Sequence, residues 1–313
     1  MKLAYFHTNT ILSSWNFWGA AHTLRRMSHE VLDAAIPTNE HGAVILTVTG
    51  EQFENFRAIF PSLDYLKQCD RIVVAGPEYV SPWLGSLYGA DWQRLTARKI
   101  GLCLESSTRA EYLAIDQVGQ DYDVCYYPDP RDVERIPNAR LQRPHIDVER
   151  FSTVGIPKLC DVGFVGSLYP KRQRFVQSLQ RRLGVQFCLG DVRVHSLEGE
   201  HQELWTSLYV RSINRLRIHV SLPSINPMTV TRPFETMACG VFLLESTELP
   251  EPLDDGTHYR RYDEHNPQEL ARLIEYYLAH EQEREQIARA GQRAVREHFS
   301  AERFWTDILK GVL

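Results

Sequence analysis

The sequence predicts two doubly wound α/β domains, each built on a parallel sheet covered by helices. Three observations support this prediction. The chain has 313 residues, about twice the length of a typical single domain. Short runs of Val, Ile and Leu alternate with longer segments of helical periodicity, as they do in βα units. Polar residues do not alternate within these runs, which indicates strands buried on both faces of a sheet.

In the first half of the chain, five apolar runs are expected to form strands. They are Leu3–Phe6, Val44–Val48, Arg71–Ala75, Ile100–Leu104 and Val124–Tyr127. Four runs in the second half are expected to do the same. They are Val162–Val165, Val185–Leu189, Ile218–Leu222 and Val241–Leu244. Helical segments lie between these runs, so each half should form an open parallel sheet.

Two helices are predicted from apolar side chains that recur at helical spacing. Residues 172–183 and 267–279 each place such side chains on one face. The second segment also carries start signals, with Asn266 as the N-cap, Pro267 in the first turn and Glu269 at the third position. Both helices are therefore expected to pack on a sheet.

The domain boundary is predicted within residues 138–160, which contain several prolines and have little periodicity. This gives an N-terminal Rossmann-like domain, residues 1–145, and a C-terminal Rossmann-like domain, residues 146–313. From Glu281 the chain is helical with a break near Ser300, and the last helix can pack back on the N-terminal domain. Two such domains face a central cleft at the carboxyl ends of their strands, where α/β sheets bind ligands.

The composition is that of an ordinary globular protein. Apolar residues make up 43% of the chain, charged residues 24%, and the formal net charge is -5. Because there is no dense basic stripe, a dedicated nucleic-acid binder is not expected. No apolar run reaches the roughly 18 residues that span a bilayer, and Met1–His7 is too short for a secretion signal. A cytoplasmic location is expected.

The six cysteines are scattered along the chain and form no CxxC pair. They are Cys69, Cys103, Cys125, Cys160, Cys188 and Cys239. Four of them lie in or beside apolar runs, so buried free thiols in a reducing compartment are the expected state.

The first candidate binding segment spans residues 161–172. A buried strand ends at Gly166-Ser167, and the next helix opens with Lys171 and Arg172. A helix N-terminus offers free N–H groups to an anion, and the two cations could hold a diphosphate. The alternative is an ordinary strand-turn-helix with solvated cations.

The second candidate segment spans residues 221–240. A strand ends at Leu222, a loop with prolines follows, and a short helix then carries Arg232 and Glu235 on one side. A carboxylate in this place could accept hydrogen bonds from a ribose diol, and the arginine could neutralise phosphate. The helix ends in small apolar residues and Gly240, a natural C-cap. The alternative is a surface ion pair worth a few tenths of a kcal/mol.

Together these segments resemble the donor half of GT-B fold glycosyltransferases. The likeness is closest to the CgeB-like (spore-maturation type) group, related to glycosyl transferases group 1. Residues 232–240 fit its Arg-x-Phe-Glu-x-x-Ala-Cys-Gly segment, and residues 162–172 fit its diphosphate loop. Residues 143–151 are similar to its Pro-x-x-Asp-x-x-x-Phe crossover, and Tyr262–Phe304 to its closing helices. The resemblance covers residues 140–313.

The resemblance implies roles for individual residues. Glu235 would bind the ribose of a nucleoside diphosphate sugar. The diphosphate would be bound by Gly166, Ser167, Lys171, Arg172 and Arg232. The loop that begins at Gly190 would lie near the base.

One position departs from the family pattern. Many group 1 enzymes carry a second glutamate eight residues before the first, next to the donor sugar, and this chain has Pro227 there. The neighbouring Asn226 is the candidate for the donor-sugar contact. Whether transfer inverts or retains configuration is left open by this departure.

The N-terminal half offers candidates on the acceptor side. His7 and Glu105 each follow a strand end, and either could be the catalytic base that deprotonates an acceptor hydroxyl. Gly19 could approach the diphosphate where the first helix opens. Trp15 and Trp18 could stack on an acceptor sugar, or they could pack on their own sheet.

No metal or cofactor is expected. Asp121-Tyr122-Asp123 matches a metal-binding D-x-D pattern but precedes a strand, at the wrong end of the sheet, and reads as a turn. Asp254-Asp255-Gly256 also reads as a turn. Neither a G-x-G-x-x-G nor a Walker loop is present, which disfavours NAD and ATP enzymes.

The sequence thus predicts a metal-independent glycosyltransferase, by resemblance a hexosyltransferase, with a UDP-, GDP- or dTDP-sugar as donor. The acceptor is unidentified and could be a glycan, a protein, a small metabolite or a modified base. Two alternatives stay open, a GT-B-fold sugar-nucleotide epimerase and a non-catalytic glycosyltransferase-like binding protein.

Overall fold

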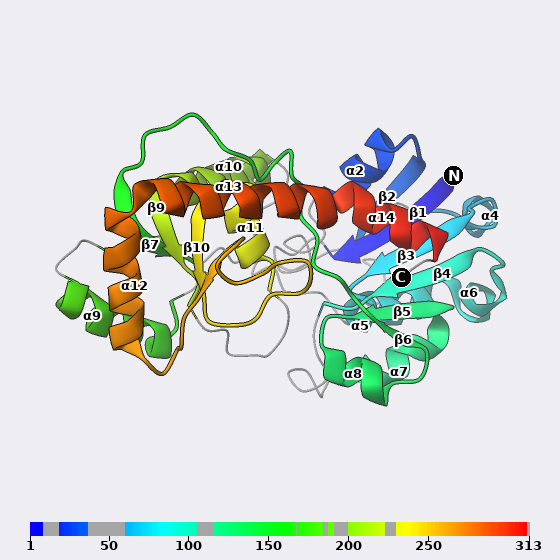
Figure 1. The fold of residues 1–313 in the computed structure, drawn as a ribbon. Coiled ribbons are helices and arrows are strands. Elements are labelled where there is room, and N and C mark those ends of the chain that lie inside the picture. Colours follow the sequence, from blue (N-terminus) through cyan, green and yellow to red (C-terminus); the bar gives the residue numbers. More distant parts are fainter. Residues whose placement is uncertain are drawn as a thin grey trace.

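The computed structural model describes residues 1–8, 19–36, 60–104, 115–166, 168–183, 187–190, 200–222 and 230–311. These residues form two α/β domains that lie side by side (Figure 1). Every strand pair in both sheets is parallel. The two doubly wound sheets confirm the predicted fold class.

The N-terminal domain is built on a sheet of six strands. The strands are β1 (Lys2–Thr8), β2 (Glu30–Ile36), β3 (Arg71–Ala75), β4 (Arg98–Leu102), β5 (Val124–Tyr127) and β6 (Ala139–Leu141). The helices are α2 (Ala20–Arg26), α4 (Leu63–Leu66), α5 (Pro77–Tyr88), α6 (Ala90–Arg94), α7 (Ile115–Val118), η2 (Gly119–Asp121) and α8 (Pro130–Arg135). The strand order is β2-β1-β3-β4-β5-β6. Separate apolar clusters cover the two faces of the sheet.

The C-terminal domain is likewise built on a parallel sheet, which has five strands. The strands are β7 (Cys160–Val165), β8 (Phe187–Gly190), β9 (Leu216–Val220), β10 (Phe242–Glu245) and β11 (Arg260–Arg261). The helices are α9 (Pro170–Leu183), α10 (Glu200–Asn214), α11 (Arg232–Ala238), α12 (Pro267–Ala279), α13 (Glu281–His298) and α14 (Ala301–Lys310). The strand order is β11-β10-β9-β7-β8. The order therefore reverses between β7 and β9, where doubly wound sheets bind ligands.

The last helix belongs to the core of the first domain. α13 runs along the C-terminal domain, and α14 follows it, at an angle, onto the N-terminal domain (Figure 1). Phe304 and Trp305 of α14 are buried in the same cluster as Leu3 and Tyr5 of β1. The rings of Tyr5 and Trp305 meet edge to face at 6.0 Å. The two domains are thus tied together by apolar burial at the end of the chain.

Several predicted elements match the structure closely. β3 and β5 have the predicted bounds, and α12 spans the predicted residues 267–279. The Asn266 side chain accepts the Glu269 N–H at 3.1 Å, as an N-cap does. The break in the C-terminal helices falls at Ser300, which caps α14. The D-x-D segment 121–123 precedes β5 as expected.

Other predicted bounds were wrong. β4 and β9 each begin and end two residues earlier than predicted, because charged residues, Arg98 and Lys99 in β4 and Arg217 in β9, lie in their first halves. Lys99 of β4 is nevertheless buried, since its Nζ donates to the Leu95 carbonyl at 3.0 Å. β2 was not predicted, and its residues are mostly exposed or half-buried. β6 lies inside the stretch predicted as linker. The predicted strand Val44–Val48 lies outside the described residues.

The expectation that all six cysteines are free thiols was wrong for two of them. Cys160 of β7 and Cys188 of β8 form a disulfide. These neighbouring strands bring the two sulfurs together, which the scattered spacing could not reveal. The remaining four cysteines are free and buried.

Within the part of the chain that the structure describes, no helix has the length and apolar character to cross a membrane.

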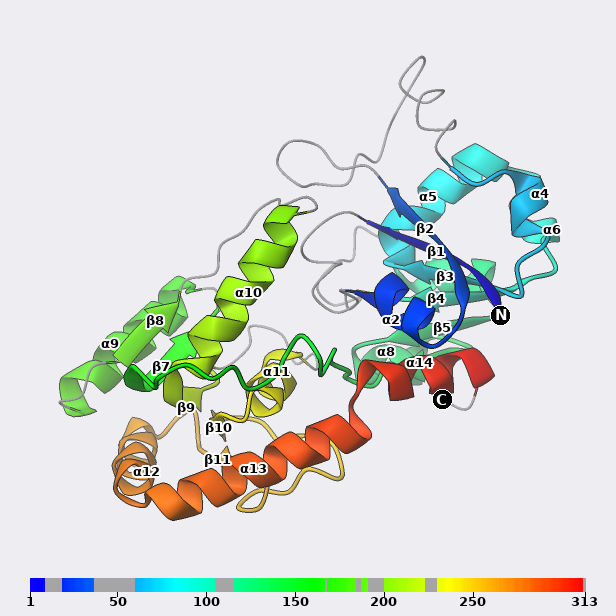
Figure 2. The ribbon, with the colours of Figure 1, turned by 90° about the horizontal axis from the view of Figure 1, so that it is seen from above.

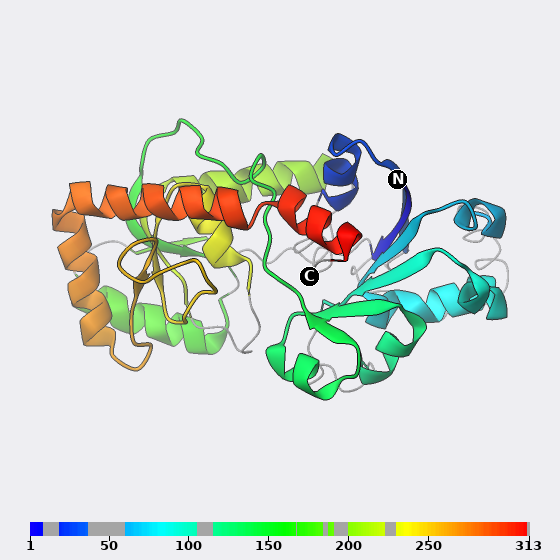
Figure 3. The ribbon, with the colours of Figure 1, turned by 45° about the vertical axis from the view of Figure 1, so that its right-hand side comes forward.

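The chain passes between the domains twice, in the linker and between α13 and α14, and these two crossings are bonded to each other. Ile146, in the linker, forms a β-bridge with Ser300, between α13 and α14. Its N–H donates to the Phe299 carbonyl and its carbonyl accepts from Ala301 N, both at 2.9 Å. Figure 3 shows the linker passing beside the junction of these two helices.

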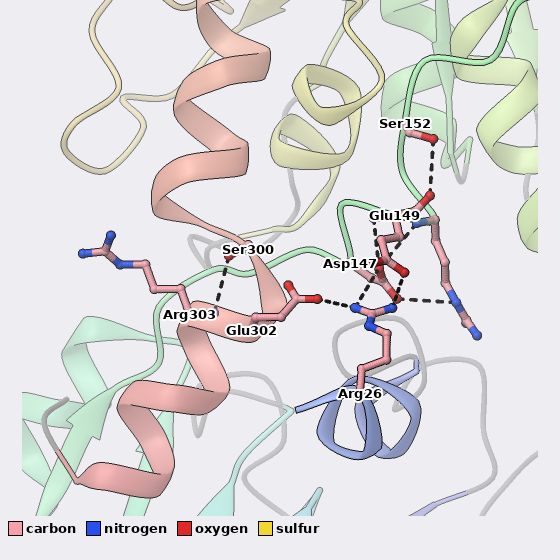
Figure 4. Close-up of polar contacts among 8 residues, drawn as sticks. Arg26, Asp147, Glu149, Ser152, Ser300, Glu302 and Arg303 are labelled. Carbon is pink, nitrogen blue, oxygen red and sulfur yellow. Dashed lines mark hydrogen bonds and ion pairs between the residues drawn. The ribbon is translucent and has the colours of Figure 1, made fainter. Parts of the chain in front are cut away.

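Arg26, at the end of α2, joins both crossings to the N-terminal domain (Figure 4). Its guanidinium donates to Glu149 Oε2 in the linker at 2.5 Å and also to Glu302 Oε1 in α14. Asp147 Oδ1 lies 3.9 Å away. One cation thus faces three carboxylates at the point where the domains meet.

We expect Arg26→Met to lower the free energy of unfolding by about 1 kcal/mol, because the three ion pairs are partly exposed and therefore individually weak. Urea titration measures the loss, and amide exchange should accelerate in α14. Arg25→Met is the matched control, since exposed Arg25 donates only to the Val31 carbonyl among the contacts resolved for it. Equal losses in the two variants would contradict this prediction.

Candidate anion site at the strand ends of the C-terminal sheet

The candidate site lies where the strand order of the C-terminal sheet reverses. β7 ends at Val165 and is followed by Gly166, and β9 ends at Val220 and is followed by Ser221. α11 lies on the side of this domain nearer the N-terminal domain (Figure 2). Arg232, the first residue of α11, lies beside Gly166 at the end of β7.

Gly166 lies in close contact with Arg232, the first residue of α11. Its φ is +151°, a conformation that favours glycine, and an added Cβ would lie 2.9 Å from the Arg232 guanidinium carbon. A side chain at this position would force the Arg232 guanidinium, or the Phe164 ring at 2.8 Å, to move. The glycine therefore allows the arginine to approach the end of the strand.

Arg172 brings a second guanidinium to the same place. Arg172 and Arg232 lie over the ring of Phe164, at 5.3 and 5.1 Å from its centroid. Arg172 is 7% exposed, and its Nη2 donates to the Leu222 carbonyl at 3.4 Å. Burial, and then the charge of Arg232, lower the pKa of Arg172 to about 10. The group stays protonated at neutral pH.

The two arginines form a strong candidate site for an anion. The buried Nε of Arg232 has no hydrogen-bond partner among the described residues. A buried donor without a partner costs free energy that a bound oxyanion would recover. Two neighbouring guanidinium groups also repel each other until an anion neutralises them. The alternative of solvated cations is wrong for Arg172, which is buried, whereas Lys171 is exposed.

His219 of β9 lies against the same aromatic ring. Its ring stacks on Phe164 with centroids 6.0 Å apart and an interplanar angle of 8°. Its Nε2 accepts the Val165 N–H at 3.1 Å, and its Nδ1 lies 2.9 Å from Thr236 Oγ1. Burial, and then the charge of Arg232, lower the pKa of His219 to about 3, so the ring is neutral.

This pKa predicts a steeper loss of stability in acid. The unfolded value is 6.5 and the folded value about 3, so between these values the unfolded chain binds one more proton. Stability therefore falls as pH falls through this window, by about 1.4 kcal/mol per pH unit from this residue. Urea unfolding between about pH 6 and pH 5 should show a correspondingly shallower slope in His219→Gln. Identical slopes would overturn the assignment of a neutral His219.

Glu235 is buried within α11 rather than paired on a surface. It is 0% exposed, so the surface ion pair is wrong as an alternative. Tyr209 donates to its Oε2 at 2.5 Å and Thr231 donates to its Oε1 at 2.7 Å. A carboxylate has further acceptor positions beyond these two bonds. Its assignment to a ribose stays a prediction.

A second buried carboxylate was missed from the sequence. Glu245 ends β10 and is 3% exposed. Its Oε1 accepts the Ser246 and Thr247 N–H groups at 2.8 and 3.2 Å, and its Oε2 has no partner among the described residues. Burial raises the pKa of Glu245. The sequence signal that could have identified Glu245 is its position at the end of an apolar strand.

The described N-terminal candidates, His7 and Gly19, belong to elements of the other domain. His7 lies in β1, and its Nε2 is 2.9 Å from Asp33 Oδ1 of β2. Gly19 opens α2 with φ +72°, and an added Cβ would lie 3.2 Å from Arg150 in the linker. The catalytic role of His7 and the diphosphate role of Gly19 stay predictions.

Other predicted site residues lie outside the described part of the chain. They are Trp15, Trp18, Glu105, Ser167 and Asn226. The residues that follow Gly190 also lie outside it. Among the residues that are described, no three His, Cys, Asp or Glu side chains group in a way that could hold a metal ion.

Part of the chain that includes this site matches a sequence model of known proteins. Residues 171–310 match the sequence model of a family described as glycosyl transferase-like. This stretch includes Arg172, His219, Arg232 and Glu235. The sequence matches no curated protein.

Solved structures of similar fold cover the whole chain. HepE from Anabaena in complex with UDP-glucose is 12% identical with a TM-score of 0.67, over 100% of this chain and 99% of that one. An alpha-glucosyltransferase in complex with UDP-glucose and DNA containing an abasic site is 9% identical with a TM-score of 0.69, over 99% of each chain. A glycosyltransferase from Rickettsia africae ESF-5 is 12% identical with a TM-score of 0.62, over 99% of this chain and 98% of that one. The chain therefore has the GT-B fold.

Proposed function

We propose that this protein is a glycosyltransferase that moves a sugar from a nucleoside diphosphate sugar to an acceptor. The observation that carries the proposal is the pair of guanidinium groups, Arg172 and Arg232, over Phe164 at the end of β7. The glycosyl transferase-like match over residues 171–310 supports it. Neighbours of the same fold were solved with UDP-glucose, so a UDP-sugar is the first donor to test.

In the proposed reaction the bond between the sugar C1 and the diphosphate oxygen breaks, and the electron pair leaves with the diphosphate. Arg172 and Arg232 stabilise the charge that develops there, together with Lys171 and the backbone at Gly166 and Ser167. Fixed positive groups aimed at developing charge are commonly the largest single contribution to such catalysis. Glu235 binds the ribose in this proposal.

On the acceptor side, an acceptor hydroxyl attacks C1 and loses its proton. His7 is the proposed base, held by its 2.9 Å bond to Asp33, and Glu105 is the second candidate. In a retaining reaction the leaving phosphate would take the proton instead. The proposal includes Asn226 at the donor sugar, Gly19 near the diphosphate and Trp15 and Trp18 at the acceptor.

The proposal also includes finer features that the sequence predicts. It places the protein in the CgeB-like group, makes the transferred unit a hexose, and locates the protein in the cytoplasm. It requires no metal and no cofactor. Undiminished transfer in the presence of EDTA would support metal independence, and cell fractionation tests the location.

A thermal-shift screen with UDP, GDP and dTDP tests the proposal first, followed by calorimetry with the best ligand. Turnover is then measured as donor hydrolysis and as transfer to candidate glycans, proteins and small metabolites. Isomerised donor in the absence of acceptor would indicate an epimerase. Tight binding without turnover toward any acceptor would indicate a binding protein. If calorimetry detects no nucleoside diphosphate binding, the proposal fails.

A further inference from the structure

His219 is a buried titratable residue that the proposed chemistry does not use. It lies in β9 at the strand-order reversal and is 0% exposed. Burying an imidazole costs free energy unless both of its nitrogens are bonded. The two hydrogen bonds of His219 therefore indicate its role.

The first bond fixes the end of β7. β7 pairs with β9 along the backbone up to Gly163, which lies opposite His219. Two residues later the Val165 N–H donates to His219 Nε2 at 3.1 Å. Val165 is the last residue of β7. The ring thus holds the chain where Gly166 approaches the Arg232 guanidinium.

The second bond fixes the ring itself. Because Nε2 accepts a backbone N–H and the ring is neutral, Nδ1 carries the proton and donates to Thr236 Oγ1 at 2.9 Å. Thr236 lies in α11, one turn after Arg232, and is 0% exposed. His219 therefore links β7 to the helix that carries one of the two arginines.

The stacked ring connects His219 to both cations. Its face packs on Phe164, and Arg172 and Arg232 lie over that same phenyl ring. A protonated His219 would add a third positive charge close to Arg232, and the low pKa of about 3 prevents this. The imidazole can thus support the two arginines without competing for the anion.

We propose that His219 is a positioning residue for the diphosphate, which sets the end of β7 and the Phe164 ring under Arg172 and Arg232. The inference rests on the proposed function, in which these arginines bind the diphosphate. His219 touches neither the donor nor the reacting atoms in this scheme. Its contribution should appear in phosphate binding and leave nucleoside binding unchanged.

The test compares His219→Gln with His219→Asn, two amides of similar polarity. A glutamine amide can reach the position of Nε2 and accept the Val165 N–H, whereas an asparagine amide ends near Nδ1 and cannot. Calorimetry should show UDP affinity about tenfold weaker in His219→Asn, as expected for loss of a buried hydrogen bond. His219→Gln should stay within about threefold of the unmodified protein. Uridine affinity, measured by ligand-observed NMR, should be unchanged in both.

His145→Asn is the matched control, because His145 is another buried histidine but stacks on Phe304 at the domain junction. We expect it to lower thermal stability without changing UDP affinity. Equal UDP affinity in His219→Asn and His219→Gln, or a parallel loss of uridine binding, overturns the positioning role alone. If the unmodified protein binds GDP or dTDP in place of UDP, the same comparison is made with that diphosphate, and if it binds none of the three, the proposed function fails. Thr236→Val gives a second measurement should either amide variant not fold, and unchanged UDP affinity there also overturns the proposal.

Discussion

Arg172→Met is expected to lower kcat/KM for the nucleotide-sugar by about 100- to 1000-fold, the usual effect of removing one electrostatic stabiliser of a charged transition state. Arg172 is 7% exposed and shares Phe164 with Arg232. Its pKa of about 10 keeps it charged at neutral pH. Because the site is shielded from water, the lost charge cannot be replaced by solvent. Steady-state kinetics with the donor selected by the screen measures the effect.

Two further variants separate charge from packing. Arg172→Lys keeps a cation but lacks the planar group that lies over Phe164, so an intermediate loss of about tenfold is expected. Arg174→Met removes an exposed arginine from the same helix and should leave kcat/KM within about twofold, in line with the small effects of surface substitutions. Should Arg172→Met keep more than about a tenth of the activity, the arginine pair is not the centre of the chemistry.

The parts of the fold that were predicted correctly are those with strong local signals. β5 is an uninterrupted apolar run with every residue buried, and α12 has both an apolar stripe and a capping side chain. β2 could not be found in this way, because only Ala34 and Ile36 of its residues are buried. Its position depends on pairing with β1, which is a tertiary interaction.

The sequence pointed to the charged residues of the candidate site, but not to the residues that hold them in place. Spacing relative to the strand ends identified Arg172 and Arg232, yet their shared contact with Phe164 requires the folded sheet. His219 was missed because a single histidine inside an apolar strand reads as core. The signal that could have identified His219 is its position one residue before the end of β9, beside which the strand order reverses. The disulfide between Cys160 and Cys188 depends likewise on the pairing of β7 with β8.

Glu235→Gln is expected to weaken UDP binding by about 10- to 100-fold, the range for losing hydrogen bonds to a charged acceptor. The specific readout is the ratio of affinities for UDP and 2′-deoxy-UDP. A site built to bond a hydroxyl rejects the analogue that lacks it, so the unmodified protein should prefer UDP and Glu235→Gln should lose most of this preference. Calorimetry with UDP and with 2′-deoxy-UDP, on the unmodified protein and on Glu235→Gln, measures the four affinities that are compared.

The burial of Glu235 makes a control for stability essential. Its bonds from Tyr209 and Thr231 mean that Glu235→Gln also costs about 1–3 kcal/mol of folding free energy. Asp132→Asn makes the same chemical change in a buried carboxylate of α8, in the other domain. It should reduce stability while keeping the preference for UDP over the deoxy ligand. If Glu235→Gln also keeps that preference, Glu235 holds α11 to Tyr209 of α10 and does not bind the ribose, because a structural carboxylate cannot distinguish the two ligands.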